Sequence, residues 1–234
     1  MILAVRDVHT FYGTSHILFG VSLEVRAGET VCLLGRNGAG KSTTLRSIMG
    51  LTRPASGSVT YNGVELIGKP PHTIARLGIG FVPDDRGIFA DLTVHENLEI
   101  AETRRRPNGD AWTLERLYSA FPTLQGLRAR RGEHLSGGEQ RLLSVARALL
   151  THPRLLIFDE PAEGLSPLVV RAVREWILRL KLSGMSILLS EQNVRFAMEV
   201  SDRAYVIDKG VIRHQGSVEE LRANEEIRRR YLMV

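Results

Sequence analysis

Short apolar runs alternate along the chain with segments whose apolar residues recur at helical spacing. The runs predict strands at residues 2–5, 21–25, 30–35, 79–84, 154–160, 186–191 and 204–210. The helical spacing predicts helices at about 41–49, 167–183 and 193–200, and helical patterns dominate from about 86 to 150. Strands that alternate with helices are typical of an α/β fold with a largely parallel sheet. We therefore expect a parallel α/β core that carries a helical insertion in the middle of the chain.

Turn and capping residues mark the ends of several of these elements. An Asn-Gly pair inside the β-like segment 57–66 is typical of a hairpin turn. A Thr or Ser followed three residues later by Glu predicts a capping box at a helix start. Thr93 with Glu96 and Ser217 with Glu220 fit this spacing and predict such helix starts.

The composition is that of an ordinary globular protein, with 43% hydrophobic and 24% charged residues. No run of about 18 apolar residues occurs, so we expect no membrane span. The start of the chain, MILAVRDV, lacks the apolar stretch of a signal peptide, and we expect a cytoplasmic location. The one cysteine, Cys32, lies in the apolar run TVCLLG and is predicted to be a buried small hydrophobic residue, neither a disulfide partner nor a ligand.

The net charge of +5 suits nucleic acid, an anionic membrane face or an acidic partner. Arginines gather in the runs at 103–107, 127–133 and 227–231. Such runs are usually solvated faces, and too few aromatic residues are interleaved for a single-strand binding platform. The charge alone does not choose among these partners.

Residues 35–42, GRNGAGKS, match the phosphate-binding pattern G-x-x-x-x-G-K-[ST]. They follow a predicted strand and open a predicted helix, which is the context that a P-loop requires. Backbone N–H groups of such a loop surround phosphates, Lys41 reaches the outer phosphates, and Ser42 offers a hydroxyl to Mg²⁺. The predicted ATP-binding residues here are Gly35, Arg36, Asn37, Gly38, Ala39, Gly40, Lys41, Ser42 and Thr43.

A P-loop needs a carboxylate on a neighbouring strand to help hold the metal ion. In RLLIFDE, four apolar residues place Asp159 at the carboxyl end of a strand, where ligands bind in parallel sheets. We therefore predict Asp159 as the second Mg²⁺ ligand. The adjacent Glu160 is then placed to orient or deprotonate an attacking water, which makes it the predicted catalytic base.

The segment LSGGEQRLLSVARALL at 135–150 is helical in pattern from Gly138 onward, yet it begins with two glycines. Each glycine costs about 1 kcal/mol relative to alanine in a helix interior, so something is expected to approach the backbone closely there. A helix N-terminus offers unpaired N–H groups and a partial positive charge. The residues thus predict a second anion-binding helix start besides the P-loop.

The pairing of LSGGEQ with the Asp159–Glu160 strand just downstream resembles the ATP-binding cassette (ABC) ATPases, and the resemblance covers essentially the whole chain. It implies one ABC ATPase domain over 1–234, a P-loop NTPase core with an N-terminal antiparallel β subdomain and a helical subdomain at about 86–150. It also implies that two such domains face head to tail around two ATP molecules. The anion at the second helix start is then the γ-phosphate of ATP on the other subunit, bound by Ser136, Gly137, Gly138 and Glu139.

Other family elements carry over with departures. Tyr12 resembles the aromatic residue that stacks on adenine, although Phe11 beside it is also available for this role. Asp84 stands where the family usually has a glutamine that contacts Mg²⁺, and its shorter reach leaves that contact open. Ser166 stands where aspartate is common, and Gln192 replaces the usual switch histidine near the hydrolysis site.

These departures resemble the LivF-type ATPases of branched-chain amino acid importers, whose relatives serve other amino acids, urea or amides. The resemblance implies a peripheral subunit on the cytoplasmic face of the cell membrane. Its implied partners are a second, probably different ATPase subunit, two permease subunits that contact residues 85–98, and indirectly a solute-binding protein.

Three other classes of protein share part of this sequence pattern. Lipopolysaccharide-export ATPases are similar in length but retain the switch histidine, so Gln192 argues against them. An ABC ATPase that acts on nucleic acid usually carries long insertions or tandem cassettes, which this chain lacks, so we expect no nucleic-acid partner. A P-loop kinase does not explain LSGGEQ.

Overall fold

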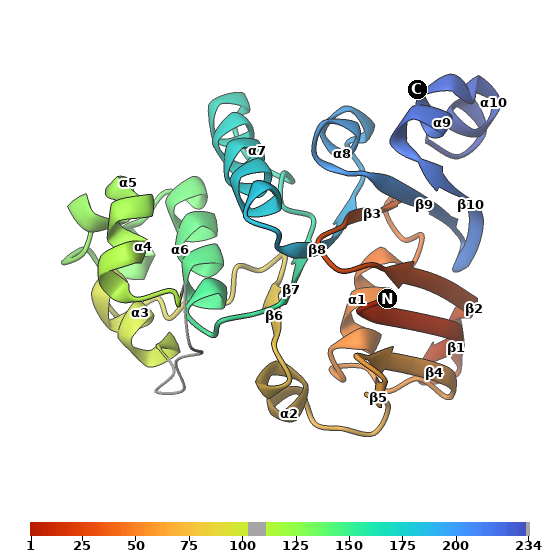
Figure 1. The fold of residues 1–234 in the computed structure, drawn as a ribbon, viewed down its shortest axis with the longest axis horizontal. Coiled ribbons are helices and arrows are strands. Elements are labelled where there is room, and N and C mark those ends of the chain that lie inside the picture. The colour runs from red at the N-terminus through yellow and green to blue at the C-terminus, as the bar shows by residue number, and fades with distance from the viewer. Residues whose placement is uncertain (103–110, 233–234) are drawn as a thin grey trace.

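A computed structural model describes residues 1–102 and 111–232. Two sheets, a set of helices between and around them, and a group of helices to one side make up the fold (Figure 1). The arginine run at 103–107 lies outside the described residues.

The first sheet is antiparallel, with strand order β2-β1-β4-β5. Its strands are β1 (Leu3–Tyr12), β2 (Ser15–Val25), β4 (Ser56–Tyr61) and β5 (Val64–Glu65). The first two strands are much longer than the apolar runs predicted. Asn62 and Gly63 both have positive φ, of 48° and 79°, as the predicted hairpin turn requires.

The second sheet has the order β10-β9-β3-β8-β7-β6. All its pairings are parallel except that of the edge strand β10 with β9. Its strands are β3 (Thr30–Leu34), β6 (Ile79–Val82), β7 (Leu155–Asp159), β8 (Ser186–Glu191), β9 (Arg203–Asp208) and β10 (Val211–Ser217). The predicted largely parallel sheet is confirmed, whereas β10 had not been expected.

Helices cover both faces of the parallel sheet. The α-helices are α1 (Lys41–Ile48), α2 (Pro71–Arg76), α3 (Val94–Ala101), α4 (Leu114–Ala120), α5 (Pro122–Gly126), α6 (Gly137–Leu149), α7 (Pro167–Leu182), α8 (Val194–Val200), α9 (Val218–Ala223) and α10 (Glu225–Ile227). A 3₁₀ turn at Gly132–His134 precedes α6, and a π-helical turn at Arg228–Leu232 follows α10. Both predicted capping boxes are formed, at the starts of α3 and α9.

Alternate residues of β3 enter two different cores because successive side chains of a strand point to opposite faces. Val31 and Leu33 pack in the core between the sheets, where α1 contacts strands of both. Cys32 and Leu34 pack in the core that also includes buried residues of α6, α7 and α8. Cys32 is buried and free, as predicted.

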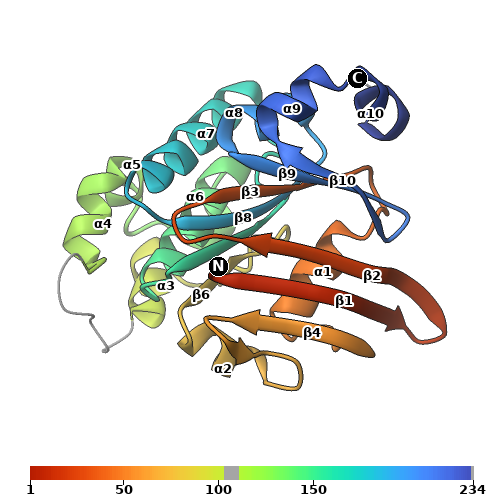
Figure 2. The ribbon, with the colours of Figure 1, turned by 45° about the vertical axis from the view of Figure 1, so that its right-hand side comes forward.

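The helices α3 to α6 lie together beside the end of the parallel sheet at β6 and β7 (Figures 1 and 2). The chain enters this group through a loop after β6, residues 83–93, and returns to the sheet from α6 into β7. None of the helices within 1–102 and 111–232 has the length and apolar character that crossing a bilayer requires.

Candidate nucleotide-binding and hydrolysis site

The predicted P-loop has the strand–loop–helix geometry that phosphate binding requires. Strand β3 ends at Leu34 and α1 begins at Lys41, so Gly35–Thr43 form the loop and the first turn of the helix. Gly40 has φ 108°, and a Cβ atom there would lie 2.8 Å from Leu18 Cδ2. Only glycine fits this position without strain. The loop therefore brings unpaired backbone N–H groups to the start of α1.

Lys41 is buried, with 3% of its surface exposed. Its Nζ donates to the carbonyl oxygens of Gly35 at 2.9 Å and Arg36 at 3.1 Å. The same amino group lies 3.0 Å from Oε1 of Glu160. The cation is thus fixed over the loop, at the position from which a P-loop lysine reaches phosphate oxygens.

Asp159, the last residue of β7, is fully buried beside the P-loop. Its Oδ1 accepts hydrogen bonds from Ser42 Oγ at 3.0 Å and Ser190 Oγ at 2.7 Å. Its Oδ2 is buried and has no hydrogen-bond partner. Burial raises the pKa of Asp159, and the charges of Asp84 and Glu160 raise it further, against the two serine hydrogen bonds. A buried carboxylate oxygen left unpaired beside a hydroxyl fits a divalent cation.

Magnesium usually binds through one or two carboxylates, with substrate phosphates completing its coordination. In the described part of the chain no three His, Cys, Asp or Glu side chains form a metal-binding group. Ser42 and Asp159 therefore fit a Mg²⁺ ion that arrives with nucleotide phosphates rather than an all-protein metal site.

Glu160 adopts a left-handed backbone conformation, with φ 47°, directly after β7. Its backbone N–H donates to Ser190 Oγ at 3.0 Å. Burial opposes ionisation of the carboxyl, but a hydrogen bond with Glu163 and the ion pair with Lys41 hold the pKa of Glu160 below its usual value. The shared hydrogen bond raises the pKa of Glu163 to about 7. Glu160 is thus an ionised carboxylate, as a general base must be.

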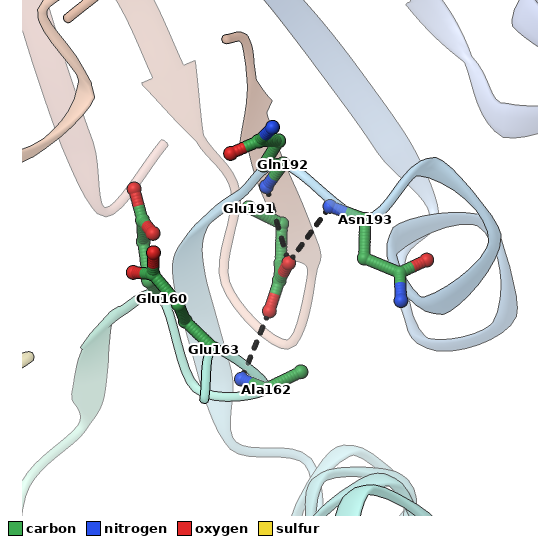
Figure 3. Close-up of a pocket in the computed structure, with 6 residues that line it drawn as sticks. All are labelled: Glu160, Ala162, Glu163, Glu191, Gln192 and Asn193. Atoms are coloured by element: carbon green, nitrogen blue, oxygen red, sulfur yellow. Dashed lines mark hydrogen bonds between the residues drawn. The ribbon is translucent and has the colours of Figure 1, made fainter. Parts of the chain in front are cut away.

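Glu160 and Glu163 line a pocket of about 340 Å³ together with the residues that follow β8 (Figure 3). Gln192, the predicted switch residue, lies in this pocket and is exposed. The buried carboxylate of Glu191 lies between the loop that follows β7 and the loop that follows β8. It accepts N–H bonds from Ala162 at 3.0 Å, Gln192 at 3.1 Å and Asn193 at 3.0 Å. Burial raises the pKa of Glu191.

The segment LSGGEQ forms the start of α6, with Ser136 as its N-cap. Ser136 and Glu139 form a capping box, in which Glu139 Oε2 accepts the Ser136 N–H at 2.7 Å. The predicted close approach to the glycines occurs within the chain itself. A Cβ atom on Gly138 would lie 2.6 Å from Val169 Cγ1, and one on Gly137 would lie 3.0 Å from Arg86 Nη2.

Two other predicted residues lie on exposed surface. Tyr12 ends β1 with 46% of its surface exposed, whereas the ring of Phe11 stacks on His16 at a centroid distance of 4.1 Å. Tyr12 is therefore the more available aromatic face of the two. The Oδ1 of Asp84 lies 3.7 Å from Arg46 Nη2, and no hydrogen bond joins this carboxylate to Ser42 or Asp159 in the described residues.

Three residues that the sequence did not single out hold the site together. Ser190 bonds to both residues of the Asp159–Glu160 pair, and Glu191 joins two loops. Arg141, on α6, is buried and donates to three backbone carbonyls. The sequence does carry a signal for each of them. Ser190 and Glu191 belong to a polar run, SEQ, at the end of an apolar strand, and Arg141 is a charged residue on the apolar face of a helix.

Comparison with known proteins shows the family to which this chain belongs. Residues 18–163 match the model of the ABC transporter family. The chain is 40% identical to the high-affinity branched-chain amino acid transport ATP-binding protein BraG of Pseudomonas aeruginosa, over 98% of this chain and 99% of that protein. It is 39% identical to the probable branched-chain amino acid transport ATP-binding protein LivF of Archaeoglobus fulgidus, over 92% of each. It is 35% identical to the lipopolysaccharide export ATP-binding protein LptB of Haemophilus influenzae, over 99% of this chain and 97% of that protein.

The fold gives the same result. A solved ATP-binding subunit of an ABC transporter superposes with a TM-score of 0.81 at 31% identity, covering 95% of this chain and 92% of the other. The chain therefore belongs to the ABC transporter family. It is an ATP-binding, ATP-hydrolysing subunit of this family, with the predicted P-loop ABC ATPase fold.

Proposed function

We propose that the buried group of Lys41, Ser42, Asp159 and Glu160 binds Mg·ATP and hydrolyses it. The unpaired Oδ2 of Asp159, next to the Ser42 hydroxyl, is the observation that carries this proposal. Ser42 and Asp159 would hold Mg²⁺, which when bound neutralises charge on the phosphates. Lys41 would bind the outer phosphates, and Glu160, released from Lys41, would orient and deprotonate the attacking water.

The helix start of α6 would serve the ATP of a second subunit. Ser136, Gly137 and Gly138 lie at the N-terminal end of a helix of 13 residues, whose N–H groups and dipole attract phosphate. In this arrangement Glu139 contributes by capping the helix, since its carboxylate already accepts the Ser136 N–H. The chain would act as one ATPase domain that needs a second cassette to complete each site.

The transport system that fits best is an importer of branched-chain or related amino acids. The support is the 40% identity to BraG across nearly the whole of both chains. The second cassette would be a different chain, and two permease subunits would dock on residues 85–98, which include the exposed Phe89. A solute-binding protein outside the membrane would deliver the amino acid, and this chain would be peripheral on the cytoplasmic side.

Co-purification with membrane partners and reconstitution test this assignment. The chain is expressed and purified together with its candidate permease, and the complex is reconstituted in proteoliposomes with the binding protein. ATPase turnover is then measured with leucine, urea or no solute. Turnover that rises with leucine-loaded binding protein supports the proposal.

The 35% identity to LptB supplies the second candidate, lipopolysaccharide export. ATPase activity that responds to lipopolysaccharide with its export permease, and not to amino acids, would replace the importer assignment. Binding of the pure chain to DNA with strong salt dependence would instead favour a nucleic-acid role.

A further inference from the structure

We infer that Arg141 is a positioning residue, which holds the backbone of Glu160 and the loop after β6 in register with the start of α6. Its Nη1 donates to the Pro83 carbonyl at 2.6 Å. Its Nη2 donates to the carbonyl of Glu160 at 3.2 Å and to that of Asp84 at 3.4 Å. One side chain on α6 thus joins the end of β7 to the loop that follows β6.

The burial of this side chain is what singles it out. Arg141 is 2% exposed, and none of the ion pairs within the described residues includes it. Its Nε is buried without a hydrogen-bond partner. Its hydrogen bonds go only to neutral carbonyls. Burial lowers the pKa of the guanidinium and outweighs the carboxylates of Asp84, Asp159 and Glu191, which favour its charge. The charge therefore contributes little to stability, because desolvating it is costly. The position of the guanidinium, rather than its stabilising effect, accounts best for its presence.

The contacts of Arg141 help to hold the backbone of Glu160. A left-handed backbone at a residue other than glycine costs of order 1–3 kcal/mol and persists only when its surroundings enforce it. Here both backbone groups of Glu160 are held by side chains. Ser190 accepts its N–H at 3.0 Å, and Arg141 donates to its carbonyl at 3.2 Å. These two contacts set the direction in which the Glu160 carboxylate points.

Two other residues of α6, Gln140 and Arg147, also contact the loop after β6. Arg86, itself in a left-handed conformation with φ 66°, donates to Gln140 Oε1 at 2.6 Å. Arg147 donates to the Gly87 carbonyl. A displacement of this loop or of α6 is therefore transmitted to Glu160 through Arg141, by a contiguous set of hydrogen bonds.

The inference rests on the proposed role of Glu160, so the experiment tests both. The full chain is assembled with a second cassette whose own site is inactivated by the mutation that matches Glu160→Gln. In this assembly the wild-type chain is compared with Arg141→Met, Arg141→Lys, Glu160→Gln and the exposed control Arg222→Met on α9. Measurements are kcat and KM for ATP, the thermal shift caused by Mg·ATP, and amide hydrogen exchange in 84–89. Where Arg141→Met does not fold, Arg141→Gln, which keeps a neutral donor, takes its place.

We expect Arg141→Met to lower kcat about tenfold or more while KM changes by less than about twofold, because the transition-state geometry and not nucleotide binding is lost. The Mg·ATP thermal shift remains, exchange in 84–89 rises, and Arg141→Lys recovers part of kcat. Arg222→Met behaves as wild type.

A variant at Arg141 that melts at a lower temperature but keeps kcat within about twofold shows a purely structural role and overturns the inference. Loss of kcat together with a proportionate rise of KM overturns it as well. Wild-type turnover by Glu160→Gln is a separate result, which refutes the proposed role of Glu160 itself.

Discussion

The Nζ of Lys41 lies 3.0 Å from Oε1 of Glu160, and the two side chains are only 3% and 10% exposed. The proposed phosphate-binding cation and the proposed base are therefore paired with each other. Phosphate oxygens that approach Lys41 compete with the Glu160 carboxylate for the same N–H donors. Binding of nucleotide and release of the base are thereby linked in one exchange of partners.

Lys41→Ala tests the binding half of this exchange. A ligand that binds only the folded state at about a hundredfold excess over its Kd stabilises the chain by about 2.7 kcal/mol. We expect Mg·ATP to raise the unfolding free energy of the wild-type chain by this amount and that of Lys41→Ala by much less. Denaturant unfolding with and without Mg·ATP measures the difference, and Lys69→Ala in the loop before α2 is the control. If Mg·ATP leaves the unfolding free energy of the wild-type chain unchanged, the proposed nucleotide-binding site is wrong.

The sequence predicted the parts of this site that depend on local order. GRNGAGKS, RLLIFDE and LSGGEQ each carry their own element. The strand before Gly35 and the strand end at Asp159 were therefore placed to within one residue, and so was the helix expected from Gly138, which begins at Gly137. The alternating strands and helices likewise indicated the parallel sheet.

What the sequence did not predict depends on packing between distant segments. Arg141 contacts carbonyls at positions 58, 57 and 19 residues away, and a charged side chain on a helix gives no sign of such partners. The edge strand β10 was missed because its residues, half-buried or exposed, show no apolar run. The Glu191 contacts likewise exist only once β7 and β8 lie side by side.

Glu160→Gln is expected to bind Mg·ATP and to stop hydrolysis, because an amide cannot accept the proton of an attacking water. The ATP-bound pair of cassettes then accumulates. Light scattering in the presence of ATP and the second cassette measures the assembly.

Adding Gly137→Asp is expected to undo this assembly, since a carboxylate at the start of α6 repels phosphate. The nearby guanidinium of Arg86 would offset part of that charge, so Gly137→Asp with Arg86→Met is the stronger disruptor. An assembly of the Glu160→Gln chain that persists in both variants shows that this helix start does not hold the second nucleotide.

The Glu160–Glu163 pair predicts a dependence of stability on pH. The pKa of Glu163 is raised to about 7 in the folded chain, first by its hydrogen bond with Glu160. A carboxyl with a raised folded-state pKa binds its proton more tightly when folded, so its contribution is full below about 4.5 and is lost as the pH rises through about 7. Glu163→Gln keeps a neutral donor and removes this loss. Its melting temperature, relative to wild type without nucleotide, is expected to rise between about pH 5 and pH 8. A constant difference across this range contradicts the shared proton.

Glu191 holds the loops after β7 and β8 by three N–H bonds. Glu191→Ala leaves these donors without their acceptor, and each buried unsatisfied donor costs about 1–3 kcal/mol. Because Gln192 and Asn193 are exposed, water replaces part of the loss, so we expect about 2–4 kcal/mol in total. Urea unfolding measures it, and Glu191→Gln, which retains one acceptor oxygen, is expected to lose less. If the unfolding free energy of Glu191→Ala equals that of the wild type, Glu191 does not stabilise these two loops.

Gln192 lines the pocket with Glu160 and Glu163, and its backbone N–H is fixed by Glu191. A protonated histidine there would meet a γ-phosphate as a charged donor, whereas glutamine offers a neutral N–H. Charge-assisted hydrogen bonds are roughly twice as strong as neutral ones, so the difference is about 1 kcal/mol. That corresponds to roughly a fivefold change in rate. We therefore expect the ATP held by this chain to be hydrolysed slowly, with Glu160 still competent.

The ATP of a second cassette that keeps a histidine at this position is expected to be hydrolysed faster, and Gln192→His in the assembled transporter tests this difference. The carboxylates that surround the pocket favour the charged form of an introduced histidine, so the variant is expected to raise the turnover of the ATP held by this chain roughly fivefold. Glu160→Gln and the matching mutation in the second cassette are measured alongside, to show which ATP is being hydrolysed. Turnover that stays the same or falls in Gln192→His means that glutamine is the adapted residue at this position and that the two ATP sites do not differ through it.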